Sequence, residues 1–194
     1  MKKMTSVAVL VAACSVSVSH AVVVGFDDLP NGSSVTTQYP GVTFSTLSGQ
    51  FNMAYGFVGA TSASNILCTA DVGGSVNCAN PTYLDFTNPV NSLTFWAIEP
   101  NNSGPVAQFN IFTVGNAPVS VILNGLAGSG NVLVDLSAYS NVTRLEIVPA
   151  PGFSQLDEGG GGIGWDDFSF TPVPAPSGLA LVGIAGLMTS RRRR

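Results

Sequence analysis

Basic residues are almost absent from the middle of this 194-residue chain. Of its seven Lys and Arg residues, two stand at positions 2–3 and four at 191–194, so Arg144 is the only one between these ends. All eleven acidic residues lie from Asp27 to Asp167, which leaves the central region with a net charge of −10. Such a surface repels phosphate backbones, and this excludes nucleic acid as a partner.

The first 21 residues are typical of a secretory signal peptide. Two lysines precede a largely apolar stretch over 7–18, and residues 19–21 (SHA) resemble the small-x-small pattern of a cleavage site. The alternative is a lipoprotein signal, in which Cys14 at the end of 11–14 (VAAC) is lipidated and becomes the new N-terminus. The stretch after Cys14 stays apolar instead of opening into a polar tether, which favours the signal peptide.

Histidine and lysine are missing from the rest of the chain. The only histidine, His20, leaves with the signal peptide, as does Cys14. Ser-His-Asp, Cys-His and Schiff-base catalysis are excluded because their side chains are absent, and zinc hydrolase sites are excluded for want of histidine. A pair of carboxylates, as in glycoside hydrolases, is the enzymatic route that remains.

Two cysteines remain after this removal. In an oxidising compartment, Cys68 and Cys78 are expected to form one disulfide that closes the loop TADVGGSVN. Two cysteines are too few for a zinc site.

From residue 22 to 171 the chain consists of short β-prone segments separated by Gly, Asn, Pro and Ser. This pattern predicts an all-β domain, an antiparallel β-sandwich of the jelly-roll kind. Strands are expected at about 22–26, 41–47, 51–58, 82–86, 91–98, 106–114, 118–124, 131–136, 142–148 and 163–170. Residues 60–65 are small and polar and are expected to form a loop.

Two of these segments alternate clearly between apolar and polar residues. In 106–114, Phe109 and Ile111 share one face, while Gln108, Asn110 and Phe112 share the other. The same pattern in 142–148 points residues 145 and 147 inward.

Two acidic doublets form the sharpest candidate site. Asp27 and Asp28 follow the first expected strand, and Asp166 and Asp167 lie in the last. In jelly rolls the first and last strands often lie close together, so the four carboxylates are expected to converge. A structural Ca²⁺ would relieve their repulsion. The alternative is that the first doublet orders the turn after it by hydrogen bonds to the backbone, while the second faces solvent.

Aromatic side chains offer a second candidate site. Trp96 and Trp165 are the candidate ligand-binding residues, because indole rings on the face or rim of a sandwich form a platform for sugar rings. The alternative is that they belong to the core, as aromatic residues in strands often do. Trp96 and Phe95 point to opposite faces, so one of them is expected to point outward.

The C-terminal segment has three parts. Residues 172–177 form a proline-rich spacer, and 178–194 contain a short apolar helix followed by Arg191, Arg192, Arg193 and Arg194. The apolar part, 178–188, is short against the about 20 residues that span a bilayer as a helix. The arginines would stay on the cytoplasmic side.

Together with an N-terminal signal peptide, this layout resembles the PEP-CTERM sorting signal of exported bacterial proteins. Pro174, Ala175 and Pro176 stand where that signal has Pro-Glu-Pro, so an alanine replaces the glutamate. The resemblance implies Sec-dependent export in a Gram-negative bacterium and transient anchoring in the inner membrane. It further implies processing by an exosortase, loss of the tail, and delivery to the cell surface or an extracellular polysaccharide matrix.

The body of the chain carries a second, weaker resemblance. GFDDLPNGSSVTTQYPGVTFS near its start and IGWDDFSFTPVPAP near its end look like the first and last segments of galactose-binding-like jelly rolls. That resemblance implies carbohydrate binding and is consistent with a structural Ca²⁺.

The sequence thus predicts an exported, non-catalytic module associated with polysaccharide. Two alternatives stay open, a carboxylate-dependent enzyme that acts on glycans and a purely structural matrix protein without a ligand. The enzyme requires two carboxylates about 5–10 Å apart in a cleft.

Overall fold

The computed structural model describes residues 19–71, 76, 78, 80–100, 104–125, 128, 130–152 and 162–174. Ser19–Val173 forms one compact unit, and the other unit consists of Met1–Val18 and Pro174–Arg194. The first 18 residues of the expected signal peptide, Cys14 among them, lie outside the described residues, as do residues 175–194, which include the whole sorting tail. Of the expected spacer at 172–177, residues 172–174 are described, and Pro172 is the last residue of a strand. No helix within the described ranges has the length and apolar character needed to cross a membrane.

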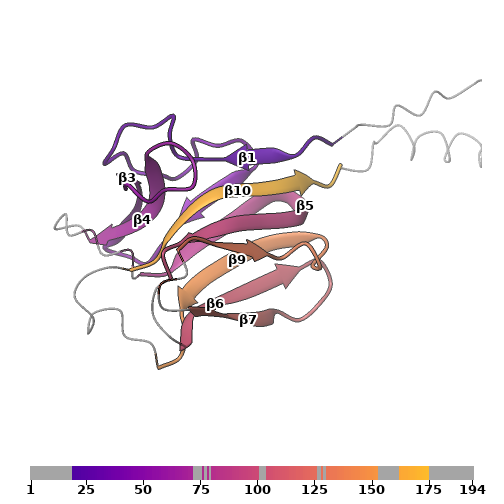
Figure 1. Ribbon diagram of the computed structural model, residues 1–194. Helices are drawn as coiled ribbons and strands as arrows, with labels where there is room; N and C mark the ends of the chain where they lie inside the picture. Colours follow the sequence, from indigo (N-terminus) through magenta and orange to yellow (C-terminus); the bar gives the residue numbers. More distant parts are fainter. Residues whose placement is uncertain are drawn as a thin grey trace, which may run out of the picture. The chain divides into compact units, whose positions relative to one another are not determined.

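The compact unit is all-β, and its described residues contain no helix (Figure 1). Every strand pairing is antiparallel. The ten strands are β1 (Val22–Val24), β2 (Val42–Ser45), β3 (Gln50–Gly56), β4 (Asn65–Asp71), β5 (Thr82–Ile98), β6 (Gly104–Thr113), β7 (Val119–Gly125), β8 (Val132–Asp135), β9 (Val142–Pro149) and β10 (Gly164–Pro172).

The long strand β5 joins two parts of the sheet, whose main order is β3-β4-β10-β5-β9-β6-β7. Its first part pairs with β2 on one side and β9 on the other. Its second part pairs with β10 and β8. The register with β9 shifts between Asp85 and Val90, around the turn-prone residues Asn88 and Pro89. Because a bulge bends a strand and increases its twist, β5 can belong to both parts.

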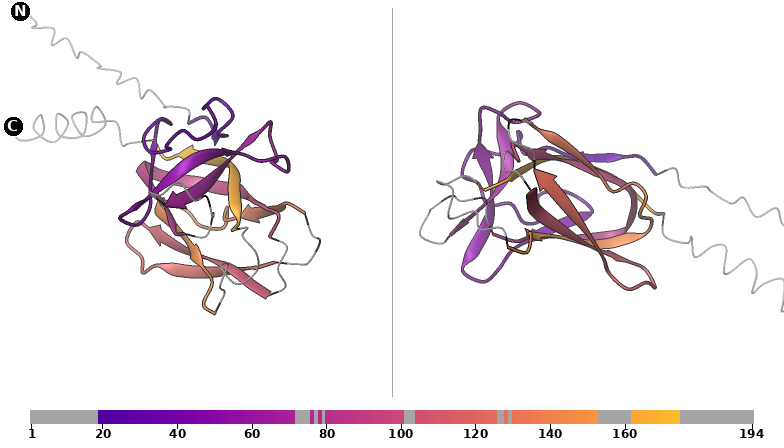
Figure 2. Two further views of the ribbon diagram at one scale, coloured as in Figure 1. Left: turned by 90° about the vertical axis from the view of Figure 1, so that its left-hand side faces the viewer. Right: turned by 60° about the horizontal axis from the view of Figure 1, so that its bottom comes forward.

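These two parts pack face to face as a sandwich (Figure 2). The ring of Phe109 on β6 lies 5.3 Å from that of Phe95 on β5 and 5.8 Å from that of Trp165 on β10, measured between centroids. Neither β5 nor β10 is hydrogen-bonded to β6, so these contacts cross the interior between the layers. Phe26, Phe44 and Phe168 extend the same cluster and are fully buried.

The structure confirms the alternation predicted for two segments. Phe109 and Ile111 are buried, while Gln108, Asn110 and Phe112 are half-buried on the opposite face. Residues 145 and 147 also point into the core.

Two predictions about the strands were wrong. The segments expected at 82–86 and 91–98 form one continuous strand, because residues 87–90 bend without breaking the pairing. Strand β4 was not predicted, and the expected loop at 60–65 ends where this strand begins, at Asn65. Its sequence NILCTAD does not alternate because Asn65 to Ala70 are all buried, and a strand buried on both faces has no period-2 signal.

The expected disulfide is present between Cys68 and Cys78, whose Cα atoms lie 4.6 Å apart. It links β4 to the segment that follows it. A hydrogen bond also holds Cys78 beside β4, since Cys78 N–H donates to Thr69 O (3.2 Å).

Candidate ligand-binding face

The outward face of β5, β9 and β6 carries an ordered set of polar and aromatic side chains. Strand register places Tyr83 beside Glu146 and Glu146 beside Asn110, which in turn lies beside Ser120 of β7. The neighbouring row runs from Asp85 through Arg144 to Phe112. We call the set Tyr83, Asp85, Gln108, Asn110, Phe112, Arg144 and Glu146 the β5–β9–β6 face. All seven side chains are neither buried nor fully exposed.

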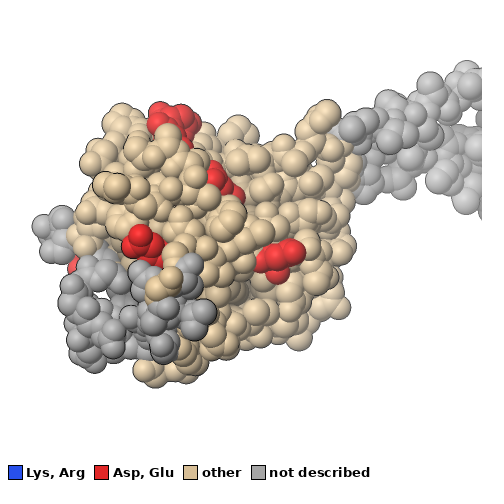
Figure 3. All heavy atoms as spheres, in the orientation of Figure 1, with Lys and Arg blue, Asp and Glu red and all other residues tan. Residues whose placement is uncertain are grey.

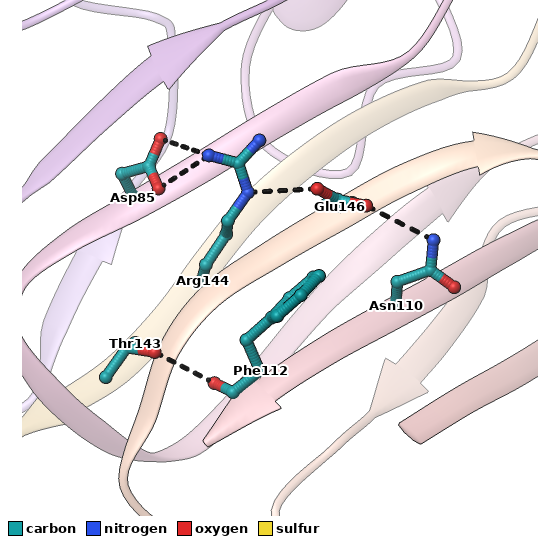
Figure 4. Close-up of polar contacts among 6 residues, drawn as sticks. All are labelled: Asp85, Asn110, Phe112, Thr143, Arg144 and Glu146. Atoms are coloured by element: carbon teal, nitrogen blue, oxygen red, sulfur yellow. Dashed lines mark hydrogen bonds and ion pairs between the residues drawn. The ribbon is translucent and has the colours of Figure 1, made fainter. Parts of the chain in front are cut away.

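Arg144, the single basic residue between Lys3 and Arg191, lies at the centre of this face (Figure 4). Its Nη1 contacts both carboxylate oxygens of Asp85 at 3.0 and 3.1 Å, and its Nε donates to Glu146 Oε1 at 3.0 Å. The guanidinium also lies over the ring of Tyr83, 5.0 Å from its centroid, which is a cation–π arrangement. Partial burial opposes the charged guanidinium, but the charges and hydrogen bonds of Asp85 and Glu146 raise the pKa of Arg144.

Amide side chains extend this network toward the edge of the sheet. Asn110 Nδ2 donates to Glu146 Oε2 at 3.3 Å. Its Oδ1 accepts hydrogen bonds from Gln108 Nε2 and Ser120 Oγ, both at 2.8 Å. Five polar side chains from β6, β7 and β9, Arg144 included, are therefore linked in one network, and each one restrains the rotamers of its neighbours.

This arrangement offers several kinds of contact to a ligand. Tyr83 and Phe112 provide partly exposed ring surface, and the amides and carboxylates provide donors and acceptors for hydroxyl groups. Because the side chains are held by one another on rigid strands, little conformational entropy is lost when a ligand binds.

The first acidic doublet has structural hydrogen bonds. Asp27 Oδ1 accepts from the N–H groups of Ser64 and Asn65 at 2.7 and 2.9 Å. Burial alone would raise the pKa of Asp27, but these N–H donors outweigh it and lower the pKa below the ordinary value. Asp28 accepts from the hydroxyl of Tyr39. These contacts of the doublet fix the loop before β4 and the ring of Tyr39.

The second doublet lies on the last strand, and the same loop covers it. Asp166 is fully buried, and its Oδ2 accepts from the N–H groups of Thr61 and Ser62 at 3.0 and 3.2 Å. Its Oδ1 accepts from the N–H of Asp167 at 2.8 Å. Burial, with a smaller contribution from the charge of Asp167, raises the pKa of Asp166 despite these N–H donors. The expectation that Asp166 faces solvent was wrong.

The two doublets do lie close together, as the pairing of β1 with β10 requires. A β-carbon placed on Gly25 would be 3.1 Å from Asp167 Oδ1 and 3.8 Å from Asp27 Oδ2. The oxygens of Asp166 and Asp27 Oδ1, however, are directed at backbone N–H groups, and N–H groups repel a cation. Among the side chains that the structure describes, no three His, Cys, Asp or Glu are grouped so that they could hold a metal ion. This donor set does not fit Ca²⁺, and calcium binding stays a prediction of the sequence.

The two tryptophans differ in position. Trp165 is 5% exposed, and its ring packs against Phe95 at 5.8 Å, so it belongs to the core and cannot stack on a sugar. Trp96 points to the opposite side of β5 and is half-buried on the outer face of the other layer, beside the exposed Leu133 of β8. The expectation that one of Phe95 and Trp96 points outward is confirmed.

Sequence reasoning missed the β5–β9–β6 face. Its residues are spread over 64 positions of the chain, from Tyr83 to Glu146, and only the register between three strands brings them together. One signal was present in the sequence. A single arginine in a region with eleven acids must be held by specific carboxylates if it is partly buried, and that arginine marks the face. Ala175, Pro176 and Arg191–Arg194 of the sorting signal lie outside the described residues, and Pro174 is exposed.

Comparison with known proteins gives few matches. No family model matches the chain, and no curated protein matches it. Among solved structures, the chain is similar to a low-affinity xylan-binding module, CBM86, from the xylanolytic gut symbiont Roseburia intestinalis, with a TM-score of 0.29 and 11% sequence identity. The similarity covers 82% of this chain and 98% of that one.

Proposed function

We propose that the protein is an exported, non-catalytic module that binds polysaccharide on the β5–β9–β6 face. The observation that carries the proposal is the position of Arg144. The only cation of the domain is held over Tyr83 by two carboxylates, on a half-exposed sheet face with linked amide side chains. Such a face offers aromatic surface for sugar rings and oriented donors and acceptors for their hydroxyl groups.

The charges on this face favour a neutral glycan. Asp85 and Glu146 together exceed the charge of Arg144 by one, and the central region as a whole carries −10. The side of the molecule drawn in Figure 3 has separate acidic residues and no visible Lys or Arg. A polymer of uronic acids would be repelled by this field, while a neutral chain would approach without cost.

The same contacts disfavour the glycan-active enzyme. A glycoside hydrolase requires one protonated and one ionised carboxyl group on either side of the bond to be cleaved. On the β5–β9–β6 face, both carboxylates are hydrogen-bonded to the guanidinium of Arg144, which lies between them where a substrate would have to sit (Figure 4). Asp166, the carboxyl group with a raised pKa, is fully buried and out of reach of a substrate.

Binding is tested by a glycan array followed by titration calorimetry, each with added calcium and with chelator. We expect neutral polysaccharides to bind and Tyr83→Ala to weaken binding about tenfold or more, which corresponds to about 1.4 kcal/mol. Trp96→Ala is the matched control, since it removes a half-buried aromatic ring from the other outer face. Retained binding in Tyr83→Ala together with loss in Trp96→Ala would move the site to that other face.

Two other outcomes test the alternatives. If no glycan binds in either condition, the purely structural matrix protein is favoured and the proposal fails. If binding is lost in chelator alone, the calcium hypothesis gains its first support, and the donor set around Asp27 and Asp166 must rearrange to hold the ion.

Export and sorting form the second part of the proposal. The disulfide between Cys68 and Cys78 is consistent with an oxidising compartment, and the resemblance of the tail to a PEP-CTERM signal suggests exosortase processing. Mass spectrometry of the protein recovered from the surface of its native cells should find neither residues 1–21 nor the four terminal arginines. Surface-exposed protein with an intact tail would contradict sorting through this signal.

A further inference from the structure

Strand β7 is an open edge of the sheet. Among the described residues it pairs only with β6, and it stands at the end of the strand order. It has seven residues, Val119–Gly125, and none of them is charged or a proline. Exposed edge strands pair readily with other strands, and natural proteins protect them with charges, prolines, bulges or short length.

The other edges of the sheet are protected. Segment 32–35 runs along β3, with Gly32 N–H donating to Ala54 O at 2.7 Å and Val35 N–H to Asn52 O at 2.8 Å. Thr36 O accepts from Phe44 N–H of β2 at 2.7 Å. Strands β1 and β8 have only three and four residues, and β8 ends in Asp135. Within the described part of the chain, β7 is therefore the long edge strand that has none of these protections.

The charge distribution is asymmetric in the same way. No charged residue occurs between Glu99 and Asp135, a stretch that contains all of β6 and β7. The rest of the central region carries all its eleven acids and Arg144. Two copies of the central region, each with a net charge of −10, repel one another over most orientations, and this repulsion is weakest where the uncharged β6–β7 hairpins meet.

Apolar side chains at this edge are only partly covered. Val119 and Val121 lie opposite the buried Ile111 and Phe109 and so point toward the core. Val119 nevertheless stays 43% exposed, because none of the described strands lies beyond β7 to cover it. On the outward face Ile122 is 40% exposed. A further strand along β7 would bury apolar surface on both faces of the sheet.

We propose that β7 pairs with β7 of a second copy of this chain, antiparallel about a two-fold axis. Ile122 is the central residue of the strand, so the pairing with the greatest overlap places it opposite the partner's Ile122. On the core side, Val121 then lies opposite the partner's Leu123. The interface is isologous, and since each copy has one such edge, assembly stops at the dimer.

Dimerisation has a consequence for the outward surface. A two-fold axis perpendicular to the sheet keeps the same face of both copies on one side. The row Tyr83, Glu146, Asn110 and Ser120 would end opposite the partner's Asn124, so the two copies of the row lie on one face but are offset along the strands. The dimer thus has one continuous sheet face with two equivalent sets of polar side chains. The inference itself does not depend on what that face binds.

Sedimentation velocity of the full-length chain over a range of micromolar concentrations tests the pairing. We expect wild type to sediment as a dimer, and Ile122→Asp and Ile122→Lys each to weaken dimerisation at least about tenfold, because like charges would meet at the two-fold axis. An equimolar mixture of the two variants should restore the dimer, since opposite charges then face each other. Val58→Asp and Val58→Lys are the matched controls, because Val58 is fully exposed in the turn after β3.

Three results would overturn the inference. They are a wild type that stays monomeric at every concentration, Ile122 variants that behave like the Val58 controls, and wild-type assemblies that grow beyond the dimer. Circular dichroism and thermal unfolding verify that each variant folds. If Ile122→Lys does not fold, Ser120→Lys replaces it, because Ser120 is an exposed residue of the same strand. Glycan binding is not a readout, so failure here leaves the proposed function untouched.

Discussion

Replacing Phe95 by alanine is expected to lower the free energy of unfolding by about 3–5 kcal/mol, the cost of removing a fully buried phenyl ring and leaving a cavity. The side chain is fully buried at the junction of the two layers. Its ring stacks on that of Phe168 with centroids 4.9 Å apart, and meets those of Phe109 and Trp165 edge to face at 5.3 and 5.8 Å. Three strands lose contacts at once when this ring is removed.

Phe112→Ala is the matched control for this change. Phe112 lies in β6, one residue from the buried Ile111, but it points outward and is half-buried. Its loss removes a ring of the same size without opening a cavity, so we expect a decrease of about 1 kcal/mol or less. Urea unfolding with an unchanged m-value measures both. Equal losses for the two variants would show that the interior between the layers does not depend on Phe95.

The sequence was informative where a strand has one buried and one exposed face. Alternation in β6 correctly placed Phe109 and Ile111 on one face, which is buried, and Asn110 and Phe112 on the other, which is half-buried. It failed for β4, because a strand covered on both faces shows no period of two. Leu67 packs in the main core, and Cys68 and Ala70 pack in a second cluster with Met53. It also failed at 87–90, where Pro89 suggested an end and the chain continued as a bent strand.

For the acidic doublets, the sequence predicted that they lie close together but not which groups their carboxylates contact. The expectation that the first and last strands adjoin was correct, and it brought Asp27 and Asp167 to the two sides of Gly25. The carboxylates were expected to bind a cation, but Asp27 and Asp166 instead accept hydrogen bonds from backbone N–H groups of the loop over 60–65. The sequence carries no mark of that loop's path, which depends on the unpredicted strand β4.

The β5–β9–β6 face was harder to predict, because it depends on the register between strands. Tyr83, Arg144 and Asn110 come from three strands, and each is unremarkable in its own segment. Only the registers of β5 and β6 on β9 place them side by side, and register depends on the core residues on the opposite face of each strand.

Replacing Asp166 is the second change with a large expected effect. In Asp166→Ala, the N–H groups of Thr61, Ser62 and Asp167 lose their acceptor beneath the loop, and we expect a loss of about 2–4 kcal/mol in the free energy of unfolding. Asp166→Asn keeps an oxygen that can accept from Thr61 and Ser62, but its amide N–H₂ faces the N–H of Asp167. Its loss should be about half as large.

The sign of the pH dependence separates this role from a simple loss of packing. Because the pKa of Asp166 is raised in the folded state, the folded protein binds more protons than the unfolded chain above pH 3.8, the ordinary value. Stability from this group is therefore present below that value and is lost as the pH rises through the folded pKa. Asp27 and Asp135 have lowered pKa values, so their contributions are lost only as the pH falls below 3.8.

The window that extends upward from about pH 4 to the raised folded pKa of Asp166 thus reports on this group. Wild-type protein should become more stable as the pH is lowered across this window, while Asp166→Asn should show a flatter profile because it has no carboxyl group to titrate. Urea unfolding at several pH values measures both profiles. Parallel profiles would mean that Asp166 ionises normally in the folded protein, and the loop over Thr61 and Ser62 would then have to admit water to the carboxylate, since burial without access to solvent raises the pKa of a carboxyl group.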